Sequence, residues 1–359
     1  MREPIHLIST QDTKSMVTEM VELLKAELWD IITHENHVYA EHNNEETKVV
    51  LDQSLRGKHV YVIADVNGKQ SVPDLVVKYN DRLLQLLLLT QNAKIHGAKT
   101  INVIPTCFPY SRQDKPVQWW LKERVAREPA ATQLVVDMFQ GLLNTDYCIT
   151  IDVHNPATIN NSKETKFVNL YTWWHVQQVL ERLKTESAIQ SPVLSGTDEW
   201  WLKKVNAIAK DLGLKHLTVL KQRDYSQPGT VDEISVYGDF AGKDVLIMDD
   251  ILDTWWSLIK LIKKLNSLPV ELRPKSINIC VTHGMFNKDA IEKLTELHEQ
   301  WMFQHIFVTD SVCRETYPPF VKVTSVAPIF ANTIKDLTIG KDINYNYGAK
   351  PVPKPEQKT

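Results

Sequence analysis

The chain reads Val245-Leu-Ile-Met-Asp-Asp-Ile-Leu-Asp-Thr-Trp-Trp-Ser257, and a helical pattern follows directly. The apolar run Val245–Met248 predicts a buried strand, because strands covered on both faces are apolar without alternation. After Ser257, apolar residues recur at helical spacing on one face, opposite three lysines. A buried strand followed by an amphipathic helix indicates an α/β fold with parallel strands. The apolar helix positions are Leu258, Ile259, Leu261, Ile262 and Leu265, and further strands are predicted at His59–Ala64, Thr100–Pro105, Tyr147–Ile151 and Ser276–Val281.

Acidic and hydroxyl side chains follow this predicted strand. Open α/β sheets bind ligands at the carboxyl ends of their strands. The adjacent carboxylates of Asp249 and Asp250 can hold a vicinal diol such as the ribose 2- and 3-hydroxyls. The hydroxyls of Thr254 and Ser257, with backbone N–H groups at the helix start, suit a phosphate. On these residues alone, an acidic helix cap with a solvated loop stays open as the alternative.

Short motifs repeat along the chain. Gly57-Lys58-x-Val60 leads to Asp65, and Gly242-Lys243-x-Val245 leads to Asp250 at the same spacing. A further matching pair is Lys99-Thr-Ile-Asn102 and Lys275-Ser-Ile-Asn278. The repeat predicts two related α/β domains, residues 1–165 and 166–348, with their boundary in the polar stretch Asn160–Lys166. The polar, proline-rich residues 349–359 predict a disordered tail.

Two loops at predicted strand ends carry candidate binding groups. Cys107-Phe-Pro-Tyr-Ser-Arg-Gln-Asp-Lys115 combines aromatic and basic residues, which fits a nucleotide with rings against the base and cations toward phosphates. An ordinary surface loop is the alternative. Asp152-Val-His154 places a carboxylate and an imidazole where both can reach a divalent cation. A histidine held only by hydrogen bonds is the alternative there.

Paired cations precede a turn-rich segment. Lys221 and Arg223 alternate on a predicted strand, so both point to one side, and Asp224–Thr230 has the composition of a mobile lid. Cations under a lid can neutralise charge during phosphoryl transfer. Solvated charges on an edge strand are the alternative.

Composition excludes several classes of function. Lys+Arg 41 against Asp+Glu 44 gives a formal net charge of -3, whereas nucleic-acid and membrane-surface binding need a cationic surface. The four cysteines lie far apart without a CxxC motif, which predicts reduced thiols. The N-terminus has no apolar signal segment. We therefore expect a cytoplasmic protein without nucleic-acid or membrane partners.

Taken together and in order, these motifs resemble the ribose-phosphate pyrophosphokinase family. The residues that carry the resemblance are Phe108–Lys115, Arg127-Glu-Pro129, Asp152-Val-His154, Asn169-Leu-Tyr171, Lys221-Gln-Arg223, Asp249–Thr254 and Thr282-His-Gly-Met-Phe286. The resemblance implies two tandem phosphoribosyltransferase-type domains and homo-oligomers, dimers or hexamers. It also implies transfer of diphosphate from Mg-ATP to ribose 5-phosphate, which gives phosphoribosyl diphosphate and AMP.

The resemblance also implies roles for individual residues. ATP would be bound by Arg112, Gln113 and Asp114, with Asn44 and Glu46 contributed by a loop of the other half of the chain or of a neighbouring subunit. Mg²⁺ would be bound by Asp152, His154 and Asp198. Ribose 5-phosphate would be bound by Asp249 and Asp250 at its hydroxyls and by Asp253, Thr254 and Ser257 at its phosphate. Lys221 and Arg223 would be catalytic, stabilising the charge of the transferring group.

The chain departs from the family at two turns. The family reads Asp-Thr-Gly-Gly-Thr where this chain has Asp253-Thr-Trp-Trp-Ser257, and Asp-x-Gly-Gly where it has Asp198-Glu-Trp-Trp201. Eight of the ten tryptophans form Trp-Trp doublets, and there is no Gly-Gly. Glycine permits positive φ and close backbone approach to phosphate, whereas an indole adds bulk. Smaller departures are His42, in place of an aromatic residue near adenine, and an apparent insertion at Pro116–Ala126.

Two alternatives to an active ribose-phosphate pyrophosphokinase are weighed on these residues. A catalytically silent member that assembles with active subunits and regulates them is favoured by the tryptophan doublets. The enzyme is favoured by the residues that are retained, because a purely structural subunit need not keep them: Lys221, Arg223, His154, Asp249 and Asp250. An ordinary phosphoribosyltransferase is disfavoured by the Phe108–Lys115 loop, which that reaction does not require.

Overall fold

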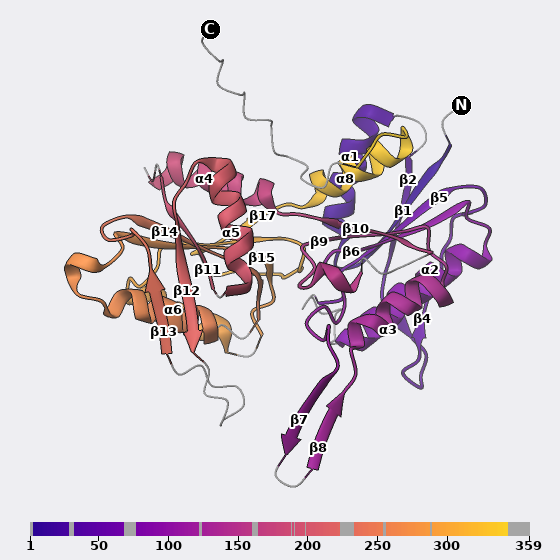
Figure 1. Cartoon of the computed structure of the whole chain (residues 1–359). Coiled ribbons are helices and arrows are strands. Elements are labelled where there is room, and N and C mark those ends of the chain that lie inside the picture. Colours follow the sequence, from indigo (N-terminus) through magenta and orange to yellow (C-terminus); the bar gives the residue numbers. More distant parts are fainter. Residues whose placement is uncertain are drawn as a thin grey trace. The chain divides into compact units, whose positions relative to one another are not determined.

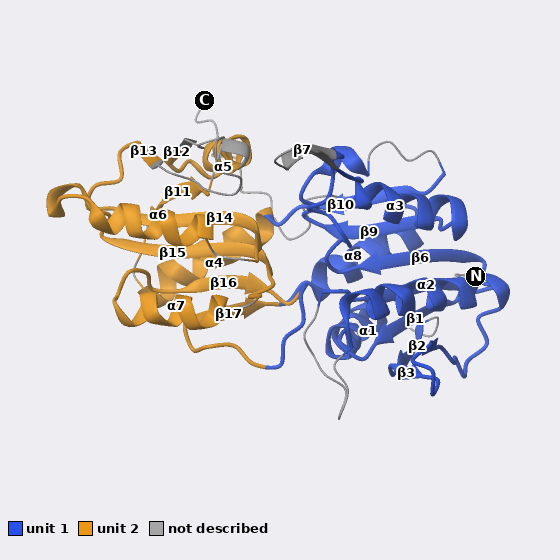
Figure 2. Ribbon diagram, turned by 90° about the horizontal axis from the view of Figure 1, so that it is seen from below, with its two compact units in different colours: residues 1–172, 311–315, 325–359 blue, residues 173–310, 316–324 orange. Residues whose placement is uncertain are grey.

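The computed structural model describes residues 3–28, 32–67, 77–121, 124–159, 164–187, 189, 191–197, 199–222, 233–253, 256–287 and 289–343; for 117–121, 124–126, 199, 200, 221, 222 and 233 it describes the backbone alone. The chain divides into two compact units, which Figure 2 shows in two colours. Unit 1 comprises residues 1–172, 311–315 and 325–359, and unit 2 comprises residues 173–310 and 316–324. Within the described ranges, no helix is both long enough and apolar enough to span a bilayer.

Unit 1 contains a six-stranded sheet in the order β10-β9-β6-β5-β1-β2, with every neighbouring pair parallel. Its strands are β1 (Ile5–Thr10), β2 (Ile32–His37), β5 (His59–Ala64), β6 (Thr100–Pro105), β9 (Tyr147–Ile151) and β10 (Lys166–Leu170). Its helices are α1 (Lys14–Leu28), α2 (Tyr79–Ile95), α3 (Ala131–Asp137), which a π-helical turn extends over Met138–Leu142, and α8 (Ala327–Thr338); a 3-10 turn lies at Pro156–Thr158.

The helices of unit 1 cover the two faces of this sheet, α2 and α3 on one side and α1 and α8 on the other (Figure 1). Strand residues alternate between these faces. Val60, Val62 and Val103 pack into one core cluster with α2 and α3, so the intervening residues Tyr61 and Asn102 face the side of α8.

Two antiparallel hairpins extend unit 1. β3 (Ala40–Glu41) pairs with β4 (Thr47–Lys48), and β7 (Val117–Leu121) pairs with β8 (Arg124–Glu128). The β7–β8 hairpin projects from the loop that follows β6 (Figure 1). It accounts for most of the apparent insertion at Pro116–Ala126.

Unit 2 contains a seven-stranded sheet in the order β13-β12-β11-β14-β15-β16-β17, parallel except for the β12–β13 pair. Its strands are β11 (Val193–Gly196), β12 (His216–Gln222), β13 (Glu233–Tyr237), β14 (Asp244–Leu252), β15 (Ser276–Gly284), β16 (Ile306–Thr309) and β17 (Val321–Thr324). Its helices are α4 (Trp173–Ser187), α5 (Glu199–Leu212), α6 (Trp256–Ser267) and α7 (Ala290–Glu299), with a 3-10 turn at Val270–Leu272. Helices α6 and α7 pack on one face and α4 and α5 on the other.

The two units repeat one arrangement. The order β10-β9-β6-β5-β1-β2 in unit 1 corresponds to β17-β16-β15-β14-β11-β12 in unit 2. The repeated motifs make the same turn contacts: Lys99 N donates to Lys58 O at 2.8 Å, and Lys275 N donates to Lys243 O at 2.8 Å. The predicted α/β class with mainly parallel sheets is therefore confirmed.

The division between the units differs from the predicted boundary at residue 165. β10 pairs with β9 in the sheet of unit 1, so the chain first changes unit after Thr172. α8, expected in the C-terminal domain, belongs to unit 1. The predicted tail, residues 349–359, lies outside the described residues.

Each unit contains one helix that follows the last strand of the other unit's sheet along the chain. α4 follows β10 and packs against α5 in unit 2. α8 follows β17 and lies along α1 in unit 1, where Ser325 Oγ donates to Glu19 Oε2 at 2.6 Å and Lys335 Nζ to Glu27 Oε1 at 3.0 Å. This exchange of helices is the physical reason why a single boundary in the sequence does not separate the units.

Replacing Phe330 in α8 with alanine is expected to destabilise unit 1 by about 3–5 kcal/mol, because the fully buried ring leaves a cavity. Hydrogen exchange measured by mass spectrometry should show protection falling in α8 and α1 but not in α5. The control Ile339→Ala, at a side chain that is 48% exposed, should change little. Protection lost in α5 instead of α1 would contradict the placement of α8.

Candidate active site

The loop that follows β6 is anchored by its aromatic residues. Phe108 is buried and packs edge-on against Phe139, with ring centroids 6.3 Å apart. The Tyr110 backbone N–H donates to the Tyr79 hydroxyl at 2.8 Å, and the Tyr110 hydroxyl donates to Asn80 Oδ1 at 2.7 Å. The expectation that rings of this loop stack on a base is therefore wrong for Phe108, whose ring belongs to the core.

The polar end of the same loop lies at the surface. Arg112 and Gln113 are exposed, in contrast to Phe108. Asp114 Oδ2 accepts a hydrogen bond from Asn155 Nδ2 at 2.6 Å. Because Asn155 follows β9, this bond joins the predicted ATP loop to the predicted metal-binding turn at the carboxyl edge of one sheet.

That turn has a strained backbone. Asp152 is 3% exposed and has a φ of 46°, which is uncommon for a residue other than glycine. The end of β10 supports it: Asp152 N donates to Leu170 O at 2.8 Å, Val153 N donates to Asn169 Oδ1 at 2.9 Å, and the Thr172 hydroxyl donates to Asp152 Oδ2. Left-handed conformations held in this way cluster at functional sites.

The residues expected to bind metal offer a small set of donors. His154 is half-buried after the turn, and Asp152 uses one carboxylate oxygen on Thr172. Asp198 lies outside the described residues. Among the residues that are described, no three His, Cys, Asp or Glu side chains gather around one metal position. Because Mg²⁺ keeps several waters and binds one or two protein carboxylates beside substrate phosphates, these donors fit a magnesium ion that arrives with a phosphate.

The turn that carries Asn44 and Glu46 connects β3 to β4. His42 N donates to Glu46 O at 2.8 Å, Glu45 N donates to His42 O at 2.9 Å, and Glu45 has a φ of 67°. Asn44 and Glu46 are exposed. A tight turn thus presents both side chains to solvent.

The start of α2 lies next to this hairpin and to the ATP loop. Burial raises the pKa of the Tyr39 phenol, just before β3, and the Asp81 carboxylate of α2 adds to the increase. The neighbouring Asn80 accepts the hydroxyl of Tyr110. Helix α2 contacts β4 of the hairpin, and Asn80 in its first turn bonds the ATP loop, so one helix contacts both.

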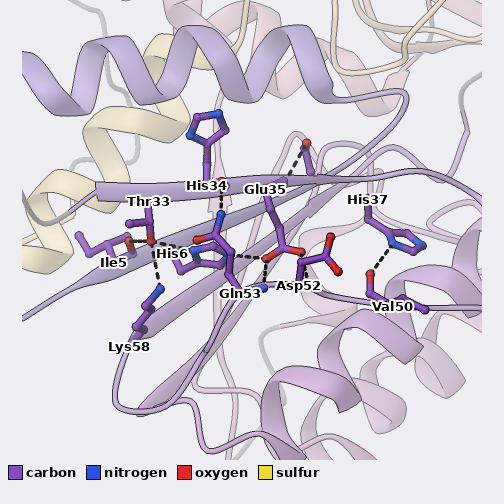
Figure 3. Close-up of polar contacts among 11 residues, drawn as sticks. Ile5, His6, Thr33, His34, Glu35, His37, Val50, Asp52, Gln53 and Lys58 are labelled. Atoms are coloured by element: carbon purple, nitrogen blue, oxygen red, sulfur yellow. Dashed lines mark hydrogen bonds and ion pairs between the residues drawn. The ribbon is translucent and has the colours of Figure 1, made fainter.

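A buried hydrogen-bond chain leads to the segment after β4 (Figure 3). His6 Nε2 lies 3.2 Å from Glu35 Oε2, and Nδ1 lies 2.7 Å from Thr33 Oγ1. A carboxylate only accepts hydrogen bonds, so Nε2 of His6 carries the proton and Nδ1 is an acceptor. The Thr33 hydroxyl therefore donates to Nδ1. Ile5 O, the other acceptor within reach of that hydroxyl, is more distant at 3.2 Å. Lys58 Nζ in turn donates to Thr33 at 3.4 Å.

The Glu35 carboxylate connects this hydrogen-bond chain to backbone N–H groups. Its carboxylate accepts from Asp52 N at 3.2 Å and from Gln53 N at 3.3 Å, and Gln53 Nε2 donates to His34 O at 3.1 Å (Figure 3). These bonds fix the segment that returns from the β3–β4 hairpin, and so they help to set the position of the turn at Asn44.

In unit 2, the predicted sugar-binding carboxylates lie inside a strand. β14 continues to Leu252, which corrects the expectation that it ends at Met248. Asp249 is half-buried; its Oδ2 accepts from the Thr197 hydroxyl at 2.8 Å and its Oδ1 from Asp250 N at 3.0 Å. Asp250 is 3% exposed and accepts from the next backbone N–H at 3.0 Å. These hydrogen bonds are why acidic residues are tolerated within a paired strand.

The predicted phosphate cradle lies at the end of β14 and the start of α6. Asp253 Oδ1 accepts from Asn287 Nδ2 at 2.6 Å, which connects it to the loop after β15. Ser257 is half-buried in the first turn of α6. Thr254 lies outside the described residues.

The predicted catalytic cations cannot be placed as side chains. The Lys221 backbone pairs with Ile234 across β12 and β13, but its side chain, like all of Arg223, lies outside what the structure describes.

The tryptophan doublets occupy contrasting environments. Trp201 is buried at 4% exposure in the core under α4, with Lys204 Nζ 4.5 Å from its ring centroid. Trp256 opens α6 and is 60% exposed. Trp201 has no positive φ, so the backbone strain expected for tryptophan at a glycine position is absent there. Trp255 is not described.

Sequence reasoning assigned no role to the short polar residues that orient the acidic ones, although Asn169 belongs to a motif that carries the family resemblance. Asn169, Thr172 and Asn155 act in unit 1, and Thr197 and Asn287 in unit 2. All five lie at strand ends or in the loops that follow them. Their position at the carboxyl edge is the signal that could have identified them.

The chain is similar to known proteins in sequence and in fold. A family described as the N-terminal domain of ribose phosphate pyrophosphokinase matches residues 5–142. Ribose-phosphate pyrophosphokinase 4 of Saccharomyces cerevisiae is 30% identical over 312 residues, which cover 87% of this chain and 87% of that protein. The chain belongs to the ribose-phosphate pyrophosphokinase family.

Other members of the family match along most of their length. Ribose-phosphate pyrophosphokinase of Campylobacter jejuni is 28% identical over 300 residues, covering 83% of this chain and 86% of that protein. The crystal structure of phosphoribosylpyrophosphate synthetase from Mycobacterium smegmatis aligns with a TM-score of 0.75 at 22% identity, covering 94% of this chain and 100% of that one. This likeness confirms the predicted fold of two phosphoribosyltransferase-type domains.

The buried His6 predicts that stability falls in acid. Burial, and to a lesser extent Lys58 and His34, lower its pKa from 6.5 to about 4. The unfolded chain therefore binds this proton first, and the free energy of unfolding should fall as pH drops from 6.5 toward 4, by at most about 3 kcal/mol. Urea unfolding at pH 7 and pH 5 measures the decrease.

Two variants isolate this contribution. His6→Gln should flatten the pH dependence, whereas His34→Gln, at an exposed histidine, should keep it. An unchanged pH profile in His6→Gln would show that another group is responsible.

Proposed function

We propose that this chain is a ribose-phosphate diphosphokinase that transfers the β,γ-diphosphate of Mg-ATP to ribose 5-phosphate, forming phosphoribosyl diphosphate and AMP. Family membership along nearly the whole chain supports the reaction class. The observation that carries the proposal for this chain is the Asn155–Asp114 bond, because it brings the ATP loop and the Asp152–His154 turn to one edge.

The nucleotide would be bound by unit 1. The exposed Arg112 and Gln113 would contact the triphosphate, which a guanidinium binds through paired donors. Asn44 and Glu46 would contact the nucleoside from their turn. Asp152 and His154, together with Asp198, would hold Mg²⁺, whose charge offsets that of the phosphates when it is bound.

The sugar phosphate would be bound by unit 2. Thr197 orients the half-buried Asp249 carboxylate through a 2.8 Å bond, and Asp249 and Asp250 would accept hydrogen bonds from the ribose hydroxyls. Asp253, Thr254 and Ser257 would surround the 5-phosphate at the start of α6, where backbone N–H groups favour an anion.

Transfer joins the two substrates. The anomeric hydroxyl oxygen bonds to the β-phosphorus, the bond from that phosphorus to the α-phosphate oxygen breaks, AMP leaves with the electron pair, and the hydroxyl proton passes to solvent. Lys221 and Arg223 would neutralise the charge on the moving diphosphate. The chain would act in the cytoplasm as a homo-oligomer, a dimer or hexamer, without nucleic-acid or membrane partners, in keeping with its net charge of -3.

A silent regulatory subunit is the second candidate, favoured by the exposed Trp256 at the position of a family glycine. A coupled assay of AMP release from Mg-ATP, with and without ribose 5-phosphate, separates the two. Release that depends on ribose 5-phosphate supports the enzyme. Its absence, with ATP still bound, supports the silent subunit.

Arg112→Ala should raise the KM for ATP at least tenfold, because an exposed guanidinium that binds the triphosphate is lost. Arg182→Ala, which removes an arginine bonded to Glu186 on α4, is the control and should leave the KM unchanged. If the KM for ATP were the same in Arg112→Ala and in the unmodified chain, the prediction that this loop binds ATP would be wrong.

Restoring glycine at Trp255 and Trp256 together should raise kcat/KM for ribose 5-phosphate several-fold, with the KM for ATP unchanged. The physical reason is that glycine N–H groups can approach the phosphate more closely. Trp301→Gly, at an indole that is 89% exposed, should have no effect. A double variant no faster than the parent chain would contradict the cradle at α6.

A further inference from the structure

A row of polar side chains crosses the amino-terminal half of the sheet in unit 1. Tyr61, Asn102 and Tyr147 are register partners on β5, β6 and β9. His59 and Thr100 form the adjacent pair, on the same face. This face is the one that α8 covers, and α8 ends at Thr338.

A cavity of about 490 Å³ lies over this row. Its volume is within the range of small-molecule sites. It is lined by the five row residues together with Glu3, Asp146, Leu337 and Thr338. It lies at the amino ends of the strands, so it is distinct from the carboxyl edge that carries the ATP loop.

One wall of the cavity is internally satisfied. Asn102 Nδ2 donates to Thr100 Oγ1 at 3.1 Å, and Thr100 Oγ1 lies 2.8 Å from His59 Nδ1. His59 Nε2 is 2.5 Å from Glu3 Oε2, and Lys99 bonds the other oxygen of Glu3. Both oxygens of the Glu3 carboxylate are therefore bonded, one by His59 and the other by Lys99.

The rest of the lining offers acceptors without partners. Within the described part of the chain, the Tyr61 hydroxyl makes no hydrogen bond although Tyr61 is only 4% exposed, and Asn102 Oδ1 makes none although Asn102 is 2% exposed. Asp146 is exposed; it uses one oxygen on Ile101 N at 2.8 Å and pairs with no cation among the described residues. A phenol hydroxyl, an amide oxygen and a carboxylate therefore line one cavity, and a ligand with N–H donors can bond all three.

In unit 2, the position equivalent to this cavity is covered by a helix. The repeated motifs make Leu246 the residue of unit 2 that is equivalent to Tyr61, and Asn278 the residue that is equivalent to Asn102. Leu246 packs in the core beneath α4. Asn278 Nδ2 bonds Gln304 Oε1 at 3.3 Å, while Asn278 Oδ1 is buried without a hydrogen bond, so the difference between the units lies at the leucine and the tyrosine. A leucine at this position is covered by a helix, whereas the tyrosine of unit 1 faces a cavity.

We propose that this cavity binds a small organic cation with N–H donors, such as an amidinium or a primary ammonium, attached to a flat or apolar body. The Asp146 carboxylate and Asn102 Oδ1 would accept its N–H groups, and the rings of Tyr61 and Tyr147 would flank its body. Tyrosine rings attract cations, and Lys166 Nζ already lies 5.2 Å from the Tyr147 ring centroid. The site is independent of the proposed reaction and should not compete with ATP.

Calorimetric titration of the full chain with benzamidine, benzamide and benzoate tests this proposal. The three share a ring and differ in charge. We expect benzamidine to bind at one site per chain, at least tenfold more tightly than benzamide, with no binding of benzoate. Prior saturation with ATP should leave the benzamidine affinity unchanged. Absence of benzamidine binding, or equal binding of benzamide, would overturn the proposal whether or not the chain releases AMP.

Two variants locate the site. Asp146→Asn keeps an oxygen for Ile101 N but removes the charge, and should weaken benzamidine binding at least tenfold. Tyr61→Phe keeps the ring and should weaken it several-fold. The control Asp137→Asn, at an exposed carboxylate on α3, should have no effect. Benzamidine affinity unchanged in Asp146→Asn, with an unaltered melting temperature, would place the ligand elsewhere.

Discussion

Parallel pairing of the strands is the constraint on which the rest of this structure depends. In unit 1 all neighbouring strands run in one direction, so every loop that leaves a carboxyl end reaches the same edge. The Asn155–Asp114 bond can form because the loops after β6 and β9 meet there. The same constraint gathers the amino ends at the opposite edge, where the polar row of Tyr61, Asn102 and Tyr147 lies. One arrangement of strands thus creates two chemically different surfaces on one unit.

Much of this arrangement could be predicted from local sequence. Apolar β-branched runs such as His59–Ala64 and Tyr147–Ile151 appear as strands with the predicted bounds, because burial on both faces requires such residues. The repeated Gly-Lys and Lys-x-Ile-Asn motifs reflect equivalent turns, since the same backbone geometry recurs in both units. The exchange of α4 and α8 could not be predicted in this way. An amphipathic pattern shows which face of a helix is buried, but not which sheet it is buried against.

The candidate site was predictable in its residue types more than in its geometry. Acidic residues near strand ends identified Asp152 and Asp249, but the pattern did not show that Thr172 and Thr197 bond their carboxylates. Phe108 shows the opposite error, since an aromatic residue in a loop motif can anchor the loop to the core as readily as it can stack on a ligand. Hydrogen bonds between residues distant in sequence depend on register, which a single sequence specifies only weakly.

The resemblance to the family predicts glycines where this chain has Trp201 and Trp256, and the two tryptophans have different physical consequences. Trp201 is buried with α4 and α5, so the apolar area it removes from water, worth about 25 cal/mol per Å², offsets the loss of glycine. Trp256 is 60% exposed and gains little from packing. Its bulk instead lies at the start of α6, where an anion would approach backbone N–H groups. Nothing comparable affects the described residues of the ATP loop. Any penalty from these two residues should therefore fall on the sugar phosphate and spare both the fold and the nucleotide.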